Sequence, residues 1–127
     1  MFRLLNRGVW VVMVVVLAGC STNRITNMTP RATPRTADGW YTIEAQWDSS
    51  QQTVRQETIE PWVVVGTELY PMQRVPLLTN RWEAAIPVPD GQRFVNYRLK
   101  FDYRYNTFGL AQPDSKSTAT YVLEVVD

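Results

Sequence analysis

One stretch of the sequence, residues 95–106, alternates strictly between apolar and polar side chains. The apolar set is Val95, Tyr97, Leu99, Phe101, Tyr103 and Tyr105, and the polar set is Asn96, Arg98, Lys100, Asp102, Arg104 and Asn106. A period of two puts each set on its own face of a β-strand, whereas the 3.6-residue period of a helix would scatter both sets. The alternation therefore predicts a long strand with one buried face and one face in water.

Shorter segments with strand character occur along the rest of the chain. They are residues 41–47, 53–59, 62–65, 68–78, 82–88 and 120–126. Pro71 and Pro76 make the fourth of these an edge strand or an irregular connection, because proline cannot donate a ladder hydrogen bond. Pro61 is expected to break the chain between the second and third segments. Residues 107–117 are interpreted as a loop.

These segments predict an all-β fold. No segment of ten or more residues shows helical spacing. About seven short strands between residue 39 and the end of the 127-residue chain, mostly with one apolar face, are typical of a small antiparallel sandwich of immunoglobulin-like type. A small closed barrel is the alternative.

Charge and composition exclude several classes of function. The formal net charge of the chain is +1, so it lacks the basic surface of a nucleic-acid-binding protein. The sequence contains no histidine and one cysteine. We therefore expect no histidine-based acid–base catalysis, no Cys/His metal site, no intramolecular disulfide and no nucleic-acid partner.

The first 19 residues have the charge and hydropathy pattern of a secretory leader. Arg3 and Arg7 precede residues 8–19, a run of twelve residues without a charge. This run is too short to span a bilayer, which takes about 20 apolar residues. Residues 1–19 are therefore expected to be a signal peptide.

The apolar run ends at Leu17-Ala18-Gly19-Cys20. This sequence resembles the lipobox of bacterial lipoproteins, and the only cysteine of the chain occupies the position that the motif requires. The resemblance implies cleavage after Gly19 and a diacylglycerol on Cys20, which anchors the chain in the membrane without any other cofactor. Ser21 stands where an aspartate would act as an inner-membrane retention signal, which favours the outer membrane, facing the periplasm, or the cell surface. The alternatives are an ordinary N-terminal anchor with a structural cysteine, or a signal peptide cut elsewhere.

Residues 20–38 are expected to be the lipidated cysteine and a flexible tether. The segment is rich in threonine and asparagine and has almost nothing to bury. Arg24, Arg31 and Arg35 are interpreted as solvated linker residues, with contacts to anionic headgroups as the alternative. The folded domain is accordingly expected at residues 39–127.

A second resemblance lies in the strand-forming part of the chain. Trp82-Glu-Ala-Ala-Ile-Pro-Val-Pro-Asp-Gly91, followed by Tyr97-Arg-Leu-Lys-Phe101-Asp102, looks like the core signature of early-set immunoglobulin-like modules, which include starch- and glycogen-binding modules. The resemblance implies the immunoglobulin-like sandwich.

The same resemblance carries over two sugar-contacting positions. The lysine of those modules corresponds to Arg98, and the tryptophan beyond the aspartate corresponds to Tyr105. A second sugar-stacking tryptophan of the family has no counterpart, because Tyr70 and Met72 occupy that region.

The sequence offers little for catalysis. Glu68, Glu83 and Asp102 are the candidates for the paired carboxylates of a glycosidase, but each is explained more simply as a solvent-facing strand residue. Neither a nucleophile elbow nor a phosphate-binding glycine loop is present, and we expect no enzyme. Aromatic residues on apolar faces are expected in the core: Trp47, Trp62 and Tyr97.

These features together predict a non-catalytic, membrane-anchored envelope lipoprotein that presents a β-sandwich to another envelope protein. The alternative is a glycan-binding lipoprotein. Unpaired edge strands would favour a protein partner, and a flat aromatic ledge would favour a glycan.

Overall fold

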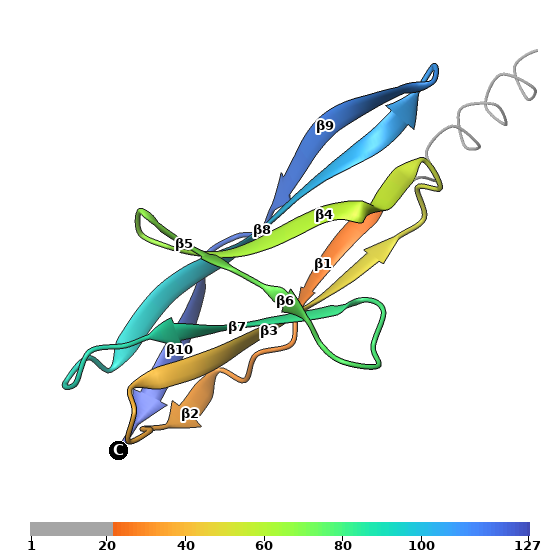
Figure 1. Ribbon diagram of the computed structural model, residues 1–127. Helices are drawn as coiled ribbons and strands as arrows, with labels where there is room; N and C mark the ends of the chain where they lie inside the picture. Colours follow the sequence, from red (N-terminus) through yellow and green to blue (C-terminus); the bar gives the residue numbers. More distant parts are fainter. Residues whose placement is uncertain (1–21) are drawn as a thin grey trace, which may run out of the picture.

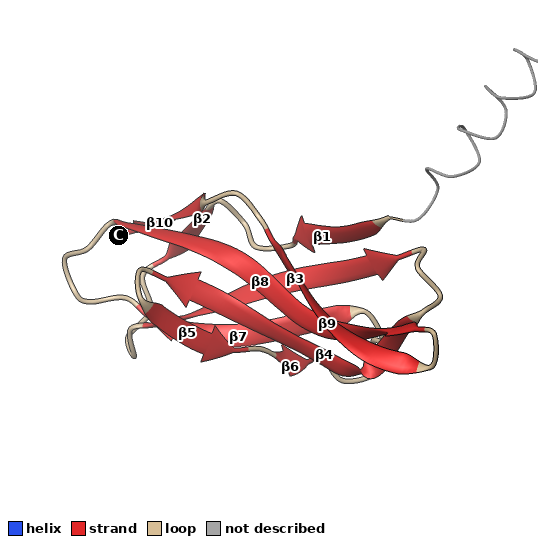
Figure 2. Ribbon diagram, turned by 90° about the horizontal axis from the view of Figure 1, so that it is seen from above, coloured by secondary structure: helices blue, strands red, loops and turns tan. Residues whose placement is uncertain are grey.

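Residues 22–127, which are the residues that the computed structural model describes, contain ten strands and no helix (Figures 1 and 2). The strands are β1 (Asn23–Asn27), β2 (Ala32–Pro34), β3 (Trp40–Ser49), β4 (Val54–Val65), β5 (Glu68–Pro71), β6 (Gln73–Arg74), β7 (Arg81–Pro87), β8 (Phe94–Thr107), β9 (Leu110–Ser117) and β10 (Tyr121–Val126). The all-β fold class is thus confirmed.

The strands form two sheets. One has the order β1-β3-β7-β6, and the other has the order β2-β10-β8-β4-β5, with β9 paired to β8. All pairs are antiparallel except β2 with β10, which run parallel. Within the described residues no strand pair joins the two sheets, so the chain is a sandwich and not a closed barrel. Four strands facing a sheet centred on β10, β8 and β4 is the immunoglobulin-like arrangement.

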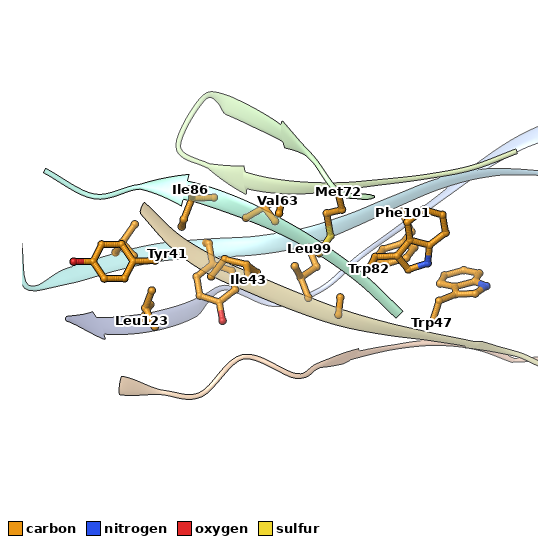
Figure 3. Close-up of a cluster of buried hydrophobic side chains, with 14 of the residues drawn as sticks. Tyr41, Ile43, Trp47, Val63, Met72, Trp82, Ile86, Leu99, Phe101 and Leu123 are labelled. Carbon is orange, nitrogen blue, oxygen red and sulfur yellow. The ribbon is translucent and has the colours of Figure 1, made fainter. Parts of the chain in front are cut away.

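The inner faces of the two sheets form one hydrophobic core (Figure 3). The alternation in β8 is confirmed, because its apolar members are buried and only Tyr105 is half-buried. The largest fully buried side chains are Phe101, Ile43, Ile86 and Leu99. Trp47 and Tyr97 lie in the core as predicted, whereas Trp62 is only half-buried, opposite Pro71 of the short edge strand β5.

Part of the predicted tether is folded. β1 pairs along β3, from Asn23 opposite Ser49 to Asn27 opposite Ala45, and β2 pairs with the end of β10. The prediction of a flexible segment is therefore wrong over these strands, and the sandwich begins at β1 rather than at residue 39. Backbone pairing at a sheet edge needs no apolar side chains, so the polar composition did not reveal it.

The sequence suggested that Pro61 breaks the chain between two strands. The structure instead places it inside β4. Its carbonyl accepts a hydrogen bond from the Met72 amide, at 2.9 Å, so its backbone faces the β5 side of the strand. β5 pairs with β4 from Trp62 onward, so the N–H that proline lacks falls where this ladder ends. A bulge between Arg55 and Glu60 shifts the register just before it.

Two other predicted segments, residues 68–78 and 107–117, lie at sheet edges. The edge character predicted for residues 68–78 is confirmed, with β5 at the edge of one sheet and β6 at the edge of the other. The loop predicted over residues 107–117 is wrong, because residues 110–117 form β9. β9 is an edge strand with polar residues on both sides and a proline, so it lacks the alternation of a half-buried strand.

Candidate functional site

The chain crosses from one sheet to the other between β1 and β2, and a groove of about 720 Å³ follows this crossing. We call it the crossover groove. It is defined by Ile25 and Asn27 of β1, Arg31, and Tyr121, Val122 and Glu124 of β10. All of β1 lies in the segment expected to be tether, so sequence reasoning missed this site. The lone apolar Ile25 among polar residues was the one available signal.

Two strand edges border the groove. Within residues 22–127, β1 pairs only with β3, and β2 covers only the last part of β10, residues 124–126. The Met28 amide bonds to β3, so by alternation the peptide groups of Ile25 face away from β3. The Glu124 amide bonds toward β2, so the peptide groups of Val122 point to that same side of β10. An extended segment laid in the groove therefore meets backbone donors and acceptors from both sheets.

The floor of the groove is aromatic and held in place by a hydrogen bond. The Asn27 side-chain amide donates to the Tyr97 hydroxyl at 2.7 Å. The rings of Tyr97 and Tyr121 lie 5.8 Å apart, tilted by 38°. Tyr97 is 2% exposed and Tyr121 is half-buried, so the floor offers the ring of Tyr121, which packs against the buried Tyr97.

Charged side chains surround the end of the groove at Arg31 and Glu124, which we call its distal end. Arg93 forms an ion pair with Glu124 at 2.7 Å. Arg35, just after β2, pairs with Asp127, and the hydrogen bond to this carboxylate raises the pKa of Arg35. These pairs tie the ends of β2, β8 and β10 together beside the groove.

The structure does not bring the two predicted sugar-contacting residues together. Arg98 is exposed on the outer face of β8, whereas Tyr105 packs partly buried against the core on the inner face. β8 keeps an unbroken register with β9 from Lys100 to Thr107, and the bulge beside it belongs to β4. An odd separation of seven positions along a regular strand therefore leaves them on opposite faces.

The three candidate carboxylates are separated as well. Glu83 alternates with buried residues of β7 and faces outward from one sheet, and Asp102 faces outward from the other. Glu68 is exposed on the edge strand β5. No two of them can flank one substrate from these positions. In the described part of the chain, no group of three or more His, Cys, Asp or Glu side chains is placed to hold a metal ion.

The predicted lipidation site, Cys20, lies outside the described residues, as does the predicted signal peptide. Among residues 22–127 there is no helix of the length and hydropathy needed to cross a membrane.

Comparison with known proteins gives a fold-level similarity. No protein-family model and no curated protein sequence matches the chain. Among solved structures, the chain is similar to murine CRIg, with 14% sequence identity and a TM-score of 0.45, over 82% of this chain and 99% of that one. The strand order described above defines the fold of this chain as an immunoglobulin-like β-sandwich.

Proposed function

We propose that the protein is a bacterial envelope lipoprotein, anchored through a lipid on Cys20, whose sandwich binds another envelope protein without catalysis. The lipobox-like sequence Leu17-Ala18-Gly19-Cys20 supports the anchor. One structural observation supports a protein partner. The edge of β1 and the first part of the edge of β10 border the crossover groove, and neither has a neighbouring strand there within residues 22–127. The proposed location is the outer membrane, facing the periplasm, or the cell surface.

The groove suits an extended peptide segment. A partner strand can pair with β1 or with the first half of β10, where backbone hydrogen bonds supply affinity. Alternate side chains of that strand would contact the half-buried ring of Tyr121 on the floor. At the distal end Glu124 is already paired with Arg93, so the exposed Arg31 supplies the charge that discriminates between partner sequences.

The anchor is tested by metabolic labelling with a fatty-acid analogue. Wild-type protein should incorporate the label, and Cys20→Ala should accumulate as unlabelled precursor because it lacks the thiol that carries the diacylglycerol. Ser21→Ala is the matched control and should remain labelled. A labelled Cys20→Ala protein would refute the anchor.

The groove is tested by photo-crosslinking in intact cells. A photoreactive residue at Val122, in the groove, is compared with one at Leu69, on the opposite edge strand β5; the two side chains are 51% and 52% exposed. We expect adducts of one defined mass from position 122 and none from position 69.

A second substitution tests strand pairing in the groove. Ile25→Pro removes an amide that faces the groove and not β3, so β1 can remain paired. It should reduce the adduct at position 122. Equal adducts from both positions, unaffected by Ile25→Pro, would show that the groove is not the binding surface.

A further inference from the structure

The β8–β9 hairpin extends past the rest of its sheet. β8 and β9 remain paired from Lys100 opposite Ser117 out to Thr107 opposite Leu110, whereas β4 pairs with β8 as far as Tyr105 and the Thr53 carbonyl just before it accepts from the Asn106 amide. The turn at Phe108 and Gly109 lies beyond this last contact. Figures 1 and 2 both place the tip of this hairpin at the end of the sandwich where β1 begins, away from the C-terminus.

The tip carries two apolar side chains in water. Phe108 is 101% exposed and Leu110 is 64% exposed. Phe108 and Gly109 form the two-residue turn and have φ values of 49° and 78°, as a type I′ turn requires. A bulky aromatic residue rarely adopts positive φ, and asparagine is the usual residue at this position. The exposed phenylalanine therefore destabilises the turn, and the requirements of folding do not explain why this residue is there.

The beginning of β1 is fastened to the base of this hairpin. The Asn23 side-chain amide donates to the Tyr103 hydroxyl at 3.0 Å, and the Lys116 ammonium donates to the Asn23 carbonyl. Thr107 lies four residues beyond Tyr103 along β8, which is about 13 Å at the usual rise of a strand. The tip thus projects past the point where β1 starts.

The chain between Cys20 and the fold is short. Cys20 precedes Thr22 by two residues, so the two Cα atoms can be at most about 7 Å apart. A lipid on Cys20 would therefore hold the beginning of β1 close to the bilayer surface. The hairpin, which extends beyond that point, would reach the bilayer first.

We propose that the hairpin tip, Phe108 and Leu110, inserts into the interfacial region of the membrane that holds the lipid on Cys20. The inference rests on the proposed lipid anchor. Two attachment points, the lipid and the tip, fix the orientation of the domain. The crossover groove runs from β1 toward the opposite end of the sandwich. In this orientation it would extend away from the bilayer surface.

Two arginines lie near the tip. Arg55 of β4 and Arg104 of β8 are Cα partners, so both cationic side chains project from the same face of the sheet. Arg55 donates to the Asn106 side chain at 2.6 Å, which directs it along the hairpin toward the tip. Four carboxylates, those of Glu57, Glu60, Asp102 and Asp114, line the hollow beside Arg104, so insertion of the tip rests on its apolar side chains and not on charge.

The test uses the full-length lipidated protein in vesicles of phosphatidylethanolamine and phosphatidylglycerol. Because the lipid blocks Cys20, an introduced cysteine is the one free thiol and takes an environment-sensitive fluorophore selectively. Leu110→Cys places the fluorophore at the tip and leaves Phe108 in place. Asp90→Cys, in the exposed turn before β8, is the control at the other end.

The tip fluorophore should shift to shorter wavelength in vesicles and become inaccessible to an aqueous quencher, and the Asp90 fluorophore should do neither. Adding Phe108→Ser should abolish the protection of the tip fluorophore while the protein still floats with the vesicles. A tip fluorophore that stays exposed on floating vesicles would overturn this inference and leave the anchor intact. Protection that occurs only in native envelopes would assign the tip to a protein partner and would also overturn it. Two reactive thiols per chain and no flotation would overturn the anchor and the inference together.

Discussion

Trp47 of β3 stacks on Phe101 of β8 across the two sheets, with ring centroids 5.2 Å apart and ring planes 8° from parallel. Tyr103 adds a tilted contact to Trp47 at 5.3 Å. In antibody domains a disulfide joins the two sheets through the corresponding pair of strands. This chain has its one cysteine at position 20, so aromatic packing makes the connection here. Such a pair contributes about 0.5–1.5 kcal/mol beyond the burial of its surface.

The first prediction concerns this contact. Phe101→Ala should lower the free energy of unfolding of residues 22–127 by about 3–5 kcal/mol, because Phe101 is fully buried and its removal leaves a cavity. Urea unfolding followed by tryptophan fluorescence measures the loss. Asp102→Ala, at the next position, is the control: it removes only a half-exposed ion pair with Lys100 at 3.6 Å and should cost less than about 1 kcal/mol. A loss below about 1 kcal/mol for Phe101→Ala would contradict its place in the core.

The second prediction concerns residues 22–38. A fragment that starts at residue 39 lacks β1 and β2, together with the hydrogen bonds from Asn23 to Tyr103 and from Asn27 to Tyr97. These two side-chain bonds alone are worth about 1–3 kcal/mol. The shorter fragment should therefore unfold at a lower urea concentration than residues 22–127. Equal midpoints would favour the flexible tether that composition suggests.

The strands that the sequence predicts well are those with one buried face. In β8 and β3 each buried side chain needs an apolar residue, so burial leaves a period of two in the sequence. β1 and β9 are edge strands held mainly by backbone pairing, which any side chain permits, and so they leave no such period. Pro61 was misleading for a related reason: its effect depends on where the neighbouring strand ends, and local sequence does not contain that information.

The candidate site could be predicted only in part. Alternation alone places Arg98 and Tyr105 on opposite faces, and the structure agrees. The crossover groove depends on Asn27 meeting Tyr97, 70 positions away along the chain, and on Tyr121 lying beside them. Such a meeting is fixed by the arrangement of the two sheets, which no local pattern of residues 23–27 reveals.

The third prediction is a dependence of stability on alkaline pH. Burial and the bond from its hydroxyl to the Asp114 carboxylate raise the pKa of Tyr103 above its usual 10.0. The unfolded chain therefore loses this proton at a lower pH than the folded domain. The stability contributed by Tyr103 is complete below pH 10 and is lost as the pH rises through the folded pKa. Tyr103→Phe should flatten this part of the curve in urea unfolding between about pH 9 and 11. An unchanged slope would show that other groups cause the decline.

The fourth prediction tests the glycan alternative. Residues 22–127 should show no retention on starch or glycogen in a pull-down, because Arg98 and Tyr105 cannot contact one sugar from opposite faces of β8. Retention that is lost in both Arg98→Ala and Tyr105→Ala would make glycan binding the better proposal.

The last prediction separates the cost of the hairpin turn from its use. Phe108 has a φ of 49° and precedes Gly109. Phe108→Asn gives the pair of residues that this turn prefers, and relief of the left-handed phenylalanine should raise the unfolding free energy of residues 22–127 by about 1 kcal/mol. The same substitution in the lipidated protein should expose a fluorophore at position 110 to aqueous quencher on vesicles. Phe108→Ala is the control, since it removes the ring but leaves a residue that rarely adopts positive φ. It should expose the fluorophore without raising stability. A Phe108→Asn protein that is more stable and still protected would mean that the ring is not what enters the bilayer.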